Sequence, residues 1–120
     1  MLKFSETMKK NYEFRRLYSK GKSAATPVLV IYCRRTKRAY NRIGITVTNK
    51  IGKAVHRNRV RRRIREIYRL NEHRLLPGTE LVIVARVRSR YVCYQELERA
   101  FLTACKRLNV LVKKESGDQK

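Results

Sequence analysis

Acidic residues are scarce in this sequence, and none lies between Glu13 and Glu66. That span holds seventeen Lys and Arg residues, and the chain of 120 residues carries 31 Lys and Arg against nine Asp and Glu, a formal net charge of +22. Hydrolases that use paired carboxylates or a carboxylate-bound metal need acids that most of this chain lacks. Because so large a positive charge opposes compact folding unless a polyanion neutralises it, nucleic acid is the first candidate partner and an anionic membrane surface is the second.

The sequence also lacks a cysteine framework, a membrane span and a signal peptide. Cys33, Cys93 and Cys105 are odd in number and form no C-x-x-C pair, which argues against disulfides or a zinc site. Their apolar neighbourhoods predict buried thiols. No apolar run approaches the length of a transmembrane helix, and residues 1–10 lack the apolar core of a signal peptide. We therefore expect a cytoplasmic protein that holds no metal.

What is present is a mixed pattern of helical and strand periodicity over one domain, residues 1–120. Helices are predicted at residues 11–20, at 57–70 and from about residue 94, where apolar residues recur as far as Leu111. Strands are predicted at 27–33, 42–48 and 80–86, with an extra short strand near 22–26. Residues 113–120 are polar and expected to fray. The pattern predicts an α+β or split α/β sandwich, with helices covering a mainly apolar sheet.

Seven arginines fall between Arg57 and Arg69, in the stretch IGKAVHRNRVRRRIREIYR. An apolar stripe about 100° wide runs through it at helical spacing and consists of Val60, Ile64, Ile67 and Tyr68. The opposite face is formed by Asn58, Arg59, Arg62, Arg65 and Arg69, with Arg61 and Arg63 on its flanks and Glu66 as its one acid. A solvated helix face typically has mixed charges and i,i+4 ion pairs, whereas here like charges follow one another at that spacing. The pattern predicts a folded helix that binds a polyanion.

The residue types indicate phosphate as the bound group. A guanidinium suits bidentate contact with phosphate oxygens, and Arg dominates Lys in this helix. The segment before the helix adds Lys50 and Lys53 around Gly52, and backbone amides at a helix start can join a phosphate site. Arg57 falls on the apolar side but in the first turn, where its side chain is expected to project past the core. Such contacts fix position and affinity, and they carry little sequence information.

Aromatic residues offer a second candidate surface. Phe14 and Tyr18 share the helix face of Leu17, at i, i+3 and i+4 spacing, and this spacing alone favours a place in the core. The alternative is a stacking platform for single-stranded RNA, to which Tyr32 would add a third ring. His56 and His73 pair with no catalytic carboxylate in the sequence, and we expect them to be structural or solvent-facing.

From Arg42 to Arg69 the sequence closely resembles the protein subunit of bacterial ribonuclease P. The family signature is a strand, a K-x-G-x-A-V turn and then R-N-R-x-[KR]-R-x-x-R. Here the signature residues are Lys50, Gly52, Ala54, Val55, Arg57, Asn58, Arg59, Arg61, Arg62 and Arg65. A generic basic helix would not reproduce the preceding strand and turn, and the resemblance extends over about residues 8–111.

The resemblance implies an α-β-β-β-α-β-α two-layer sandwich, similar to the ribosomal S5 domain 2-like fold. It also implies a left-handed crossover around the arginine helix, against the usual handedness. The family's enzyme removes the 5′ leader from precursor tRNA. Its catalysis belongs to an RNA subunit with Mg²⁺, and we expect the protein to bind no cofactor of its own.

The resemblance also implies two RNA-binding surfaces. The signature region contacts the catalytic RNA, and to this role we assign Lys50, Lys53, Arg57, Asn58, Arg59, Arg61, Arg62, Arg65 and Arg69. A cleft between the first helix and the sheet takes the single-stranded leader, with Phe14, Tyr18 and Tyr32 as its aromatic residues and Val30 and Thr46 as candidates for its floor. Neither a membrane nor DNA is expected as a partner. The alternatives are a small basic ribosomal protein of the same fold and an autonomous ribonuclease.

Overall fold

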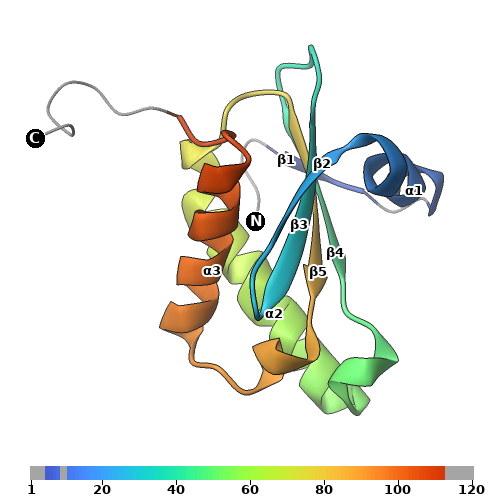
Figure 1. Cartoon of the computed structure of the whole chain (residues 1–120), viewed down its shortest axis with the longest axis vertical. Coiled ribbons are helices and arrows are strands. Elements are labelled where there is room, and N and C mark those ends of the chain that lie inside the picture. Colours follow the sequence, from blue (N-terminus) through green and yellow to red (C-terminus); the bar gives the residue numbers. More distant parts are fainter. Residues whose placement is uncertain (1–4, 9–10, 113–120) are drawn as a thin grey trace, which may run out of the picture.

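The computed structural model describes residues 5–8 and 11–112, so the tail predicted to fray, 113–120, lies outside the described residues. The chain builds one five-stranded sheet in the order β1-β4-β5-β3-β2, with three longer helices around it (Figure 1). The strands are β1 (Ser5–Thr7), β2 (Lys22–Ala25), β3 (Leu29–Arg35), β4 (Asn41–Thr46) and β5 (Thr79–Ala85). The helices are α1 (Asn11–Lys20), α2 (Ala54–Asn71) and α3 (Tyr94–Arg107), with the short 3-10 turns η1 (Asn49–Ile51), η2 (Glu72–Arg74) and η3 (Val87–Arg90).

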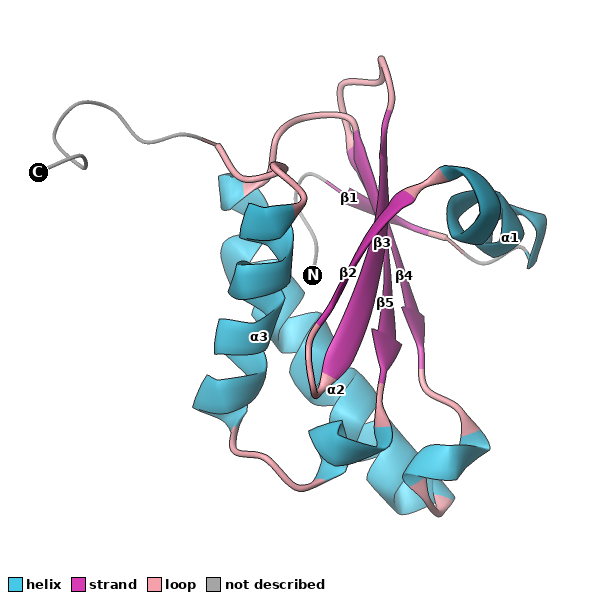
Figure 2. Cartoon of the chain, viewed as in Figure 1, coloured by secondary structure: helices cyan, strands magenta, loops and turns pink. Residues whose placement is uncertain are grey.

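The helices lie on both faces of the sheet, as Figure 2 shows, with α2 and α3 together on one face and α1 on the other. The main core, between the sheet and the α2–α3 layer, buries Ile31, Ile43, Leu81, Leu97 and Phe101 among others. A smaller cluster under α1 is built on Met8, Leu17 and Val82. The mixed α+β class is thus confirmed: the sheet and the α2–α3 layer form the expected sandwich, and α1 covers part of the outer face.

The predicted elements are present, with the ends of the predicted strands shifted by one or two residues, and three further details differ. β1 was not predicted, because three residues are too few to show a period-2 pattern, and α2 begins at Ala54 rather than at residue 57. α3 ends at Arg107, so Leu111 is not part of the helix but bridges Leu75. The chain leaves α3 through Asn109, whose φ of 59° is the left-handed conformation that commonly ends helices.

β4 and β5 are parallel neighbours joined through α2, so the arginine helix is the crossover of a β-α-β unit. Residues Arg42–Thr46 pair in register with Glu80–Val84. This arrangement agrees with the implied α-β-β-β-α-β-α order, to which β1 is added at the start. The left-handed sense of the crossover and the likeness to the ribosomal S5 domain remain predictions from the resemblance.

Two of the three cysteines are buried, and the prediction was wrong for Cys93, which is exposed. Cys93 occupies the N-cap position of α3 in extended conformation, where the side chain leaves the apolar face that α3 turns to the core. Burial raises the pKa of the Cys33 thiol and raises that of Cys105 to about 12. Within the described part of the chain, no helix is long and apolar enough to cross a bilayer.

Alkylation of the native protein at pH 8 is expected to modify Cys93 alone. The thiolate is the reactive form, and burial disfavours it at Cys33 and Cys105 while also blocking the reagent. Peptide mass spectrometry after brief treatment with iodoacetamide would locate the adduct, and the same treatment in denaturant should label all three cysteines. Rapid labelling of Cys105 in the native protein would contradict the packing of α3 on the sheet.

Candidate nucleic-acid interface

The apolar stripe of α2 is buried as predicted. Val60, Ile64, Ile67 and Tyr68 are each only 1% exposed, and the Tyr68 ring meets Phe101 of α3 edge to face, with ring centroids 6.4 Å apart. Asn71 at the end of the helix donates from Nδ2 to the Ile67 carbonyl and to Glu98 Oε2. The helix is therefore packed on the core from Val60 to Asn71, and the outer side chains of this part project from a rigid support.

The side of α2 that faces solvent carries the predicted cations. We call it the arginine face, consisting of Asn58, Arg59, Arg62, Arg65 and Arg69, all exposed. Among the residues that the structure describes, Arg69 is the arginine of this face that pairs with an acid: Nε and Nη2 donate to the two carboxylate oxygens of Glu66 at 3.0 and 2.6 Å. This hydrogen bonding lowers the pKa of Glu66 and raises that of Arg69. The pair partly neutralises the positive charge of the arginine face near the C-terminal end of α2.

The other arginines of the segment turn toward the protein. Arg57 Nη1 donates to the Gly52 carbonyl at 2.7 Å, and Arg63 Nη1 donates to the Val92 carbonyl at 3.1 Å. Arg61 donates to Asn58 Oδ1 at 3.2 Å. Within the described part of the chain, the predicted cations whose side chains make no hydrogen bond or ion pair are Lys50, Lys53, Arg59, Arg62 and Arg65. Because Arg57 is bound to the Gly52 carbonyl, it stabilises the turn before the helix instead of projecting past the core.

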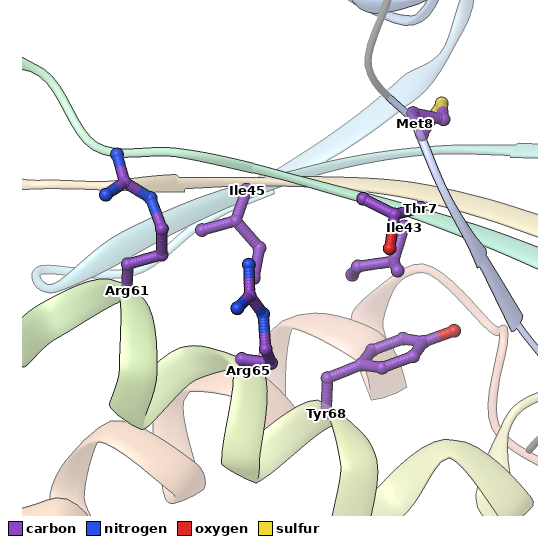
Figure 3. Close-up of a pocket in the computed structure, with 7 residues that line it drawn as sticks. All are labelled: Thr7, Met8, Ile43, Ile45, Arg61, Arg65 and Tyr68. Atoms are coloured by element: carbon purple, nitrogen blue, oxygen red, sulfur yellow. The ribbon is translucent and has the colours of Figure 1, made fainter. Parts of the chain in front are cut away.

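A small cavity of about 100 Å³ lies beside the arginine face, between α2 and the edge of the sheet. Figure 3 shows Arg61 and Arg65 extending from α2 toward the sheet, with the Arg65 guanidinium close to Ile45 of β4. Ile43 and Met8 complete the apolar wall. Cationic groups over an apolar wall suit a sugar–phosphate unit, whose ribose packs on carbon while its phosphate meets the guanidinium.

The turn before α2 depends on Gly52. Its φ is +138°, which L side chains rarely adopt, and a Cβ there would lie 2.7 Å from Arg90 Nη1. Arg90 fills that space because Nη1 donates to the Ile51 carbonyl at 3.1 Å and Nη2 lies 3.0 Å from His56 Nε2. The sequence assigned no role to Arg90, since the partners lie 34 and 39 positions away.

The opposite face of the sheet brings the second set of predicted residues together. Strand register places Val30 of β3 beside Val84 of β5, and Val84 beside Thr46 of β4, in one row. The next row is Tyr32, Val82 and Gly44. Val84 belongs to this surface and was missed, because β5 is apolar almost throughout and its sequence does not reveal which residues face α1.

Helix α1 adds two aromatic side chains to these rows. Phe14 lies on Gly44 so closely that a Cβ at Gly44 would be 2.2 Å from the ring. Tyr18 meets Tyr32 edge to face, with centroids 4.8 Å apart, and its hydroxyl hydrogen-bonds Thr46 Oγ1 at 3.3 Å. We call this cluster the aromatic surface; it comprises the predicted Phe14, Tyr18, Val30, Tyr32 and Thr46, together with Val84. Leu17 is buried beneath α1 while Tyr18 is 40% exposed, so the helix has both a core side and an aromatic edge.

One end of the α1-covered face is held by ion pairs. Arg42 of β4 pairs with Glu13 of α1 and lies 4.0 Å from Glu80 of β5, which also pairs with Arg38 at 3.6 Å. Both carboxylates are buried. These two acids therefore have a structural role in joining α1 to the sheet.

Comparison with known proteins decides the family. The model of the family described as Ribonuclease P matches residues 2–109. The chain is 42% identical over 106 residues to the ribonuclease P protein component of Clostridioides difficile, covering 88% of this chain and 93% of that protein. It is 39% identical to the component of Natranaerobius thermophilus, covering 89% and 93%. The chain belongs to the ribonuclease P protein family.

Solved structures of the family have the same fold. The ribonuclease P protein of Staphylococcus aureus superposes with a TM-score of 0.81 at 29% identity, covering 88% of this chain and 97% of that one. The protein of Thermotoga maritima gives 0.77 at 27% identity, covering 91% and 99%. Membership in a family of tRNA-processing ribonuclease components confirms the identity expected from the K-x-G-x-A-V turn and the Arg-Asn-Arg start of the helix.

Proposed function

We propose that this ribonuclease P protein binds the catalytic RNA of a cytoplasmic ribonuclease P through the arginine face and the single-stranded 5′ leader of precursor tRNA through the aromatic surface. In this proposal the RNA subunit, with Mg²⁺, cleaves the phosphodiester, and the protein supplies no catalytic group. The observation that carries the proposal is the set of exposed cations that have no partner among the described residues, on a helix whose other side is buried.

The arginine face suits a folded RNA because the helix that carries its charges is already packed on the core before binding. Arg59, Arg62 and Arg65 project from this helix, so little backbone entropy is lost when they meet phosphates. Lys50 and Lys53 extend the same charge ahead of the helix. The cavity between Arg65 and Ile45 would hold one sugar–phosphate unit of the RNA at the edge of the face.

The aromatic surface suits an unpaired strand because its rings are only partly covered. Phe14 and Tyr32 are half-buried and Tyr18 is exposed, which leaves ring surface on which bases can stack. A paired strand keeps its bases in the helix stack and cannot use such a surface. The leader is the part of precursor tRNA that mature tRNA lacks, so this contact would favour the substrate over the product.

The charge of the protein would also lower the requirement for Mg²⁺. Two RNAs that meet at a reaction site repel each other through their phosphates, and protein cations replace part of the counterion atmosphere there. The Mg²⁺ ions of the reaction would then be held by RNA. Glu13 and Glu80 are already engaged by Arg42, which supports leaving them out of the chemistry.

Adding the protein to a bacterial ribonuclease P RNA at low Mg²⁺ is expected to stimulate cleavage of precursor tRNA strongly, and at high Mg²⁺ only weakly. The reason is that metal ions at high concentration screen the same phosphates that the protein neutralises. The measurement is the single-turnover rate of leader release, with RNA alone, protein alone and both together.

Absence of stimulation at low Mg²⁺ would overturn the proposal. Cleavage by the protein alone would support an autonomous ribonuclease, and tight binding to ribosomal RNA in preference to ribonuclease P RNA would support a ribosomal role.

A further inference from the structure

A second cationic surface lies at the end of the sheet where β4 and β5 finish. There η1, the start of α2 and η3 contact one another (Figure 1). Three large apolar side chains on these segments are exposed: Val55 at 66%, Val87 at 46% and Tyr91 at 70%. We call this region the Tyr91 corner, residues 49–57 and 86–93. It includes none of the aromatic surface.

Tyr91 is held beside a fixed cation. The Arg90 guanidinium lies 5.1 Å from the centroid of the Tyr91 ring, and the same guanidinium is bound to the Ile51 carbonyl and to His56. Arg90 is therefore held in place by η1 and α2, the segments that contain the family signature. A ring that is 70% exposed next to a fixed guanidinium offers both a stacking surface and a charge for the adjoining phosphate.

The charge of the corner indicates what covers it. Residues 49–57 and 86–93 contain no Asp or Glu and carry six cations, Lys50, Lys53, Arg57, Arg86, Arg88 and Arg90. A protein partner that buried Val55 and Tyr91 would have to bury or match that charge, whereas an RNA strand supplies phosphates and apolar base faces together.

We propose that Tyr91 and Arg90 form a stacking site for one unpaired nucleobase of the catalytic RNA, distinct from the arginine face and from the aromatic surface. The site rests on the proposed function, because it extends the same RNA contact. The catalytic RNA is the favoured source since the corner adjoins the start of α2, where the arginine face begins, and since the chain passes from Tyr91 into the α2–α3 layer, on the side of the sheet away from α1.

The chain contains no Trp, so a single introduced indole reports on one position. Tyr91→Trp is expected to lose most of its fluorescence when ribonuclease P RNA is added, because stacking on a base quenches indole emission. Tyr40→Trp is the matched control: Tyr40 is 41% exposed and has the Arg38 guanidinium 5.8 Å from its ring, but it lies between β3 and β4 at the other end of the sheet. Its emission should change little.

Affinity gives the second readout. Tyr91→Ala should raise the Kd for the catalytic RNA roughly tenfold, the effect of losing one stacked base, while Tyr91→Phe should stay close to the unchanged protein. Equal binding by Tyr91→Ala and the unchanged protein would overturn the proposal. If the fluorescence of Tyr91→Trp is quenched only after precursor tRNA is added, the stacked base belongs to the substrate and the assignment to catalytic RNA is wrong. If the unchanged protein fails to bind the catalytic RNA, the proposed function fails, and this control separates the two ideas.

Discussion

Replacing Arg62 and Arg65 together with Gln is expected to weaken binding to ribonuclease P RNA about a hundredfold, since each charge-assisted contact to phosphate contributes roughly a tenfold effect or more. The slope of log affinity against log salt concentration should fall in magnitude by about two, because two fewer phosphates release their counterions. Both side chains are exposed and neither bonds a described residue, so the fold should be unaffected. A salt titration of RNA binding measures both quantities.

The matched control is Arg99→Gln with Lys106→Gln on α3. This variant also loses two positive charges, and it loses them from an exposed helical surface on the same side of the sheet. If both double variants weaken binding alike, net charge alone holds the RNA and the arginine face has no special place. An unchanged salt slope in the Arg62 and Arg65 variant would contradict phosphate contact by these two residues.

Replacing Phe14 with Ala is expected to weaken binding of precursor tRNA to the assembled enzyme about tenfold while leaving the affinity for mature tRNA unchanged. The ring forms part of the wall of the aromatic surface, and loss of one stacked base has about this effect. Tyr32→Ala should act in the same direction from β3. Equilibrium binding of the two tRNAs, each to enzyme reconstituted with the variant protein, gives the ratio.

Tyr12→Ala controls for a general disturbance of α1. Tyr12 is on the same helix and 49% exposed, outside the cluster under α1, and its removal should leave the ratio of precursor to mature tRNA affinity as it was. Thermal unfolding of each variant shows whether lost packing accounts for the effect, since Phe14 is half-buried against the Met8, Leu17 and Val82 cluster. Equal weakening of both tRNAs would mean that the surface does not hold the leader.

The two surfaces are related through a single strand. Along β4 the side chains alternate: Ile43 and Ile45 face α2 and line the cavity beside Arg61 and Arg65, while Gly44 and Thr46 face α1. A strand has a period of two residues, so neighbouring positions serve opposite faces of the sheet. This geometry lets the proposed sites for catalytic RNA and leader lie on opposite sides of one thin layer.

Much of this arrangement was predictable from sequence because it depends on local periodicity. The 3.6-residue repeat of Val60, Ile64 and Ile67 fixed which side of α2 is buried, and hence which arginines are exposed. In residues 42–48 the sequence alternates Ile43, Ile45 and Val47 with smaller or polar residues, which predicts that Thr46 lies on the strand face opposite the isoleucines. β5 gave no such signal, and Val84 was missed, because a strand that is apolar throughout does not distinguish its two faces.

By itself, therefore, the sequence determined the excess of charge, the helix that carries it and the family to which the chain belongs. Only the tertiary structure decided that Arg63 is engaged, because its partner, the Val92 carbonyl, lies 29 positions away. It also decided that Arg90 supports the Gly52 turn across 39 positions and holds Tyr91 beside it. The physical reason is that periodicity is a property of neighbouring residues, whereas the partner of a long cationic side chain depends on which distant backbone groups packing brings within its reach.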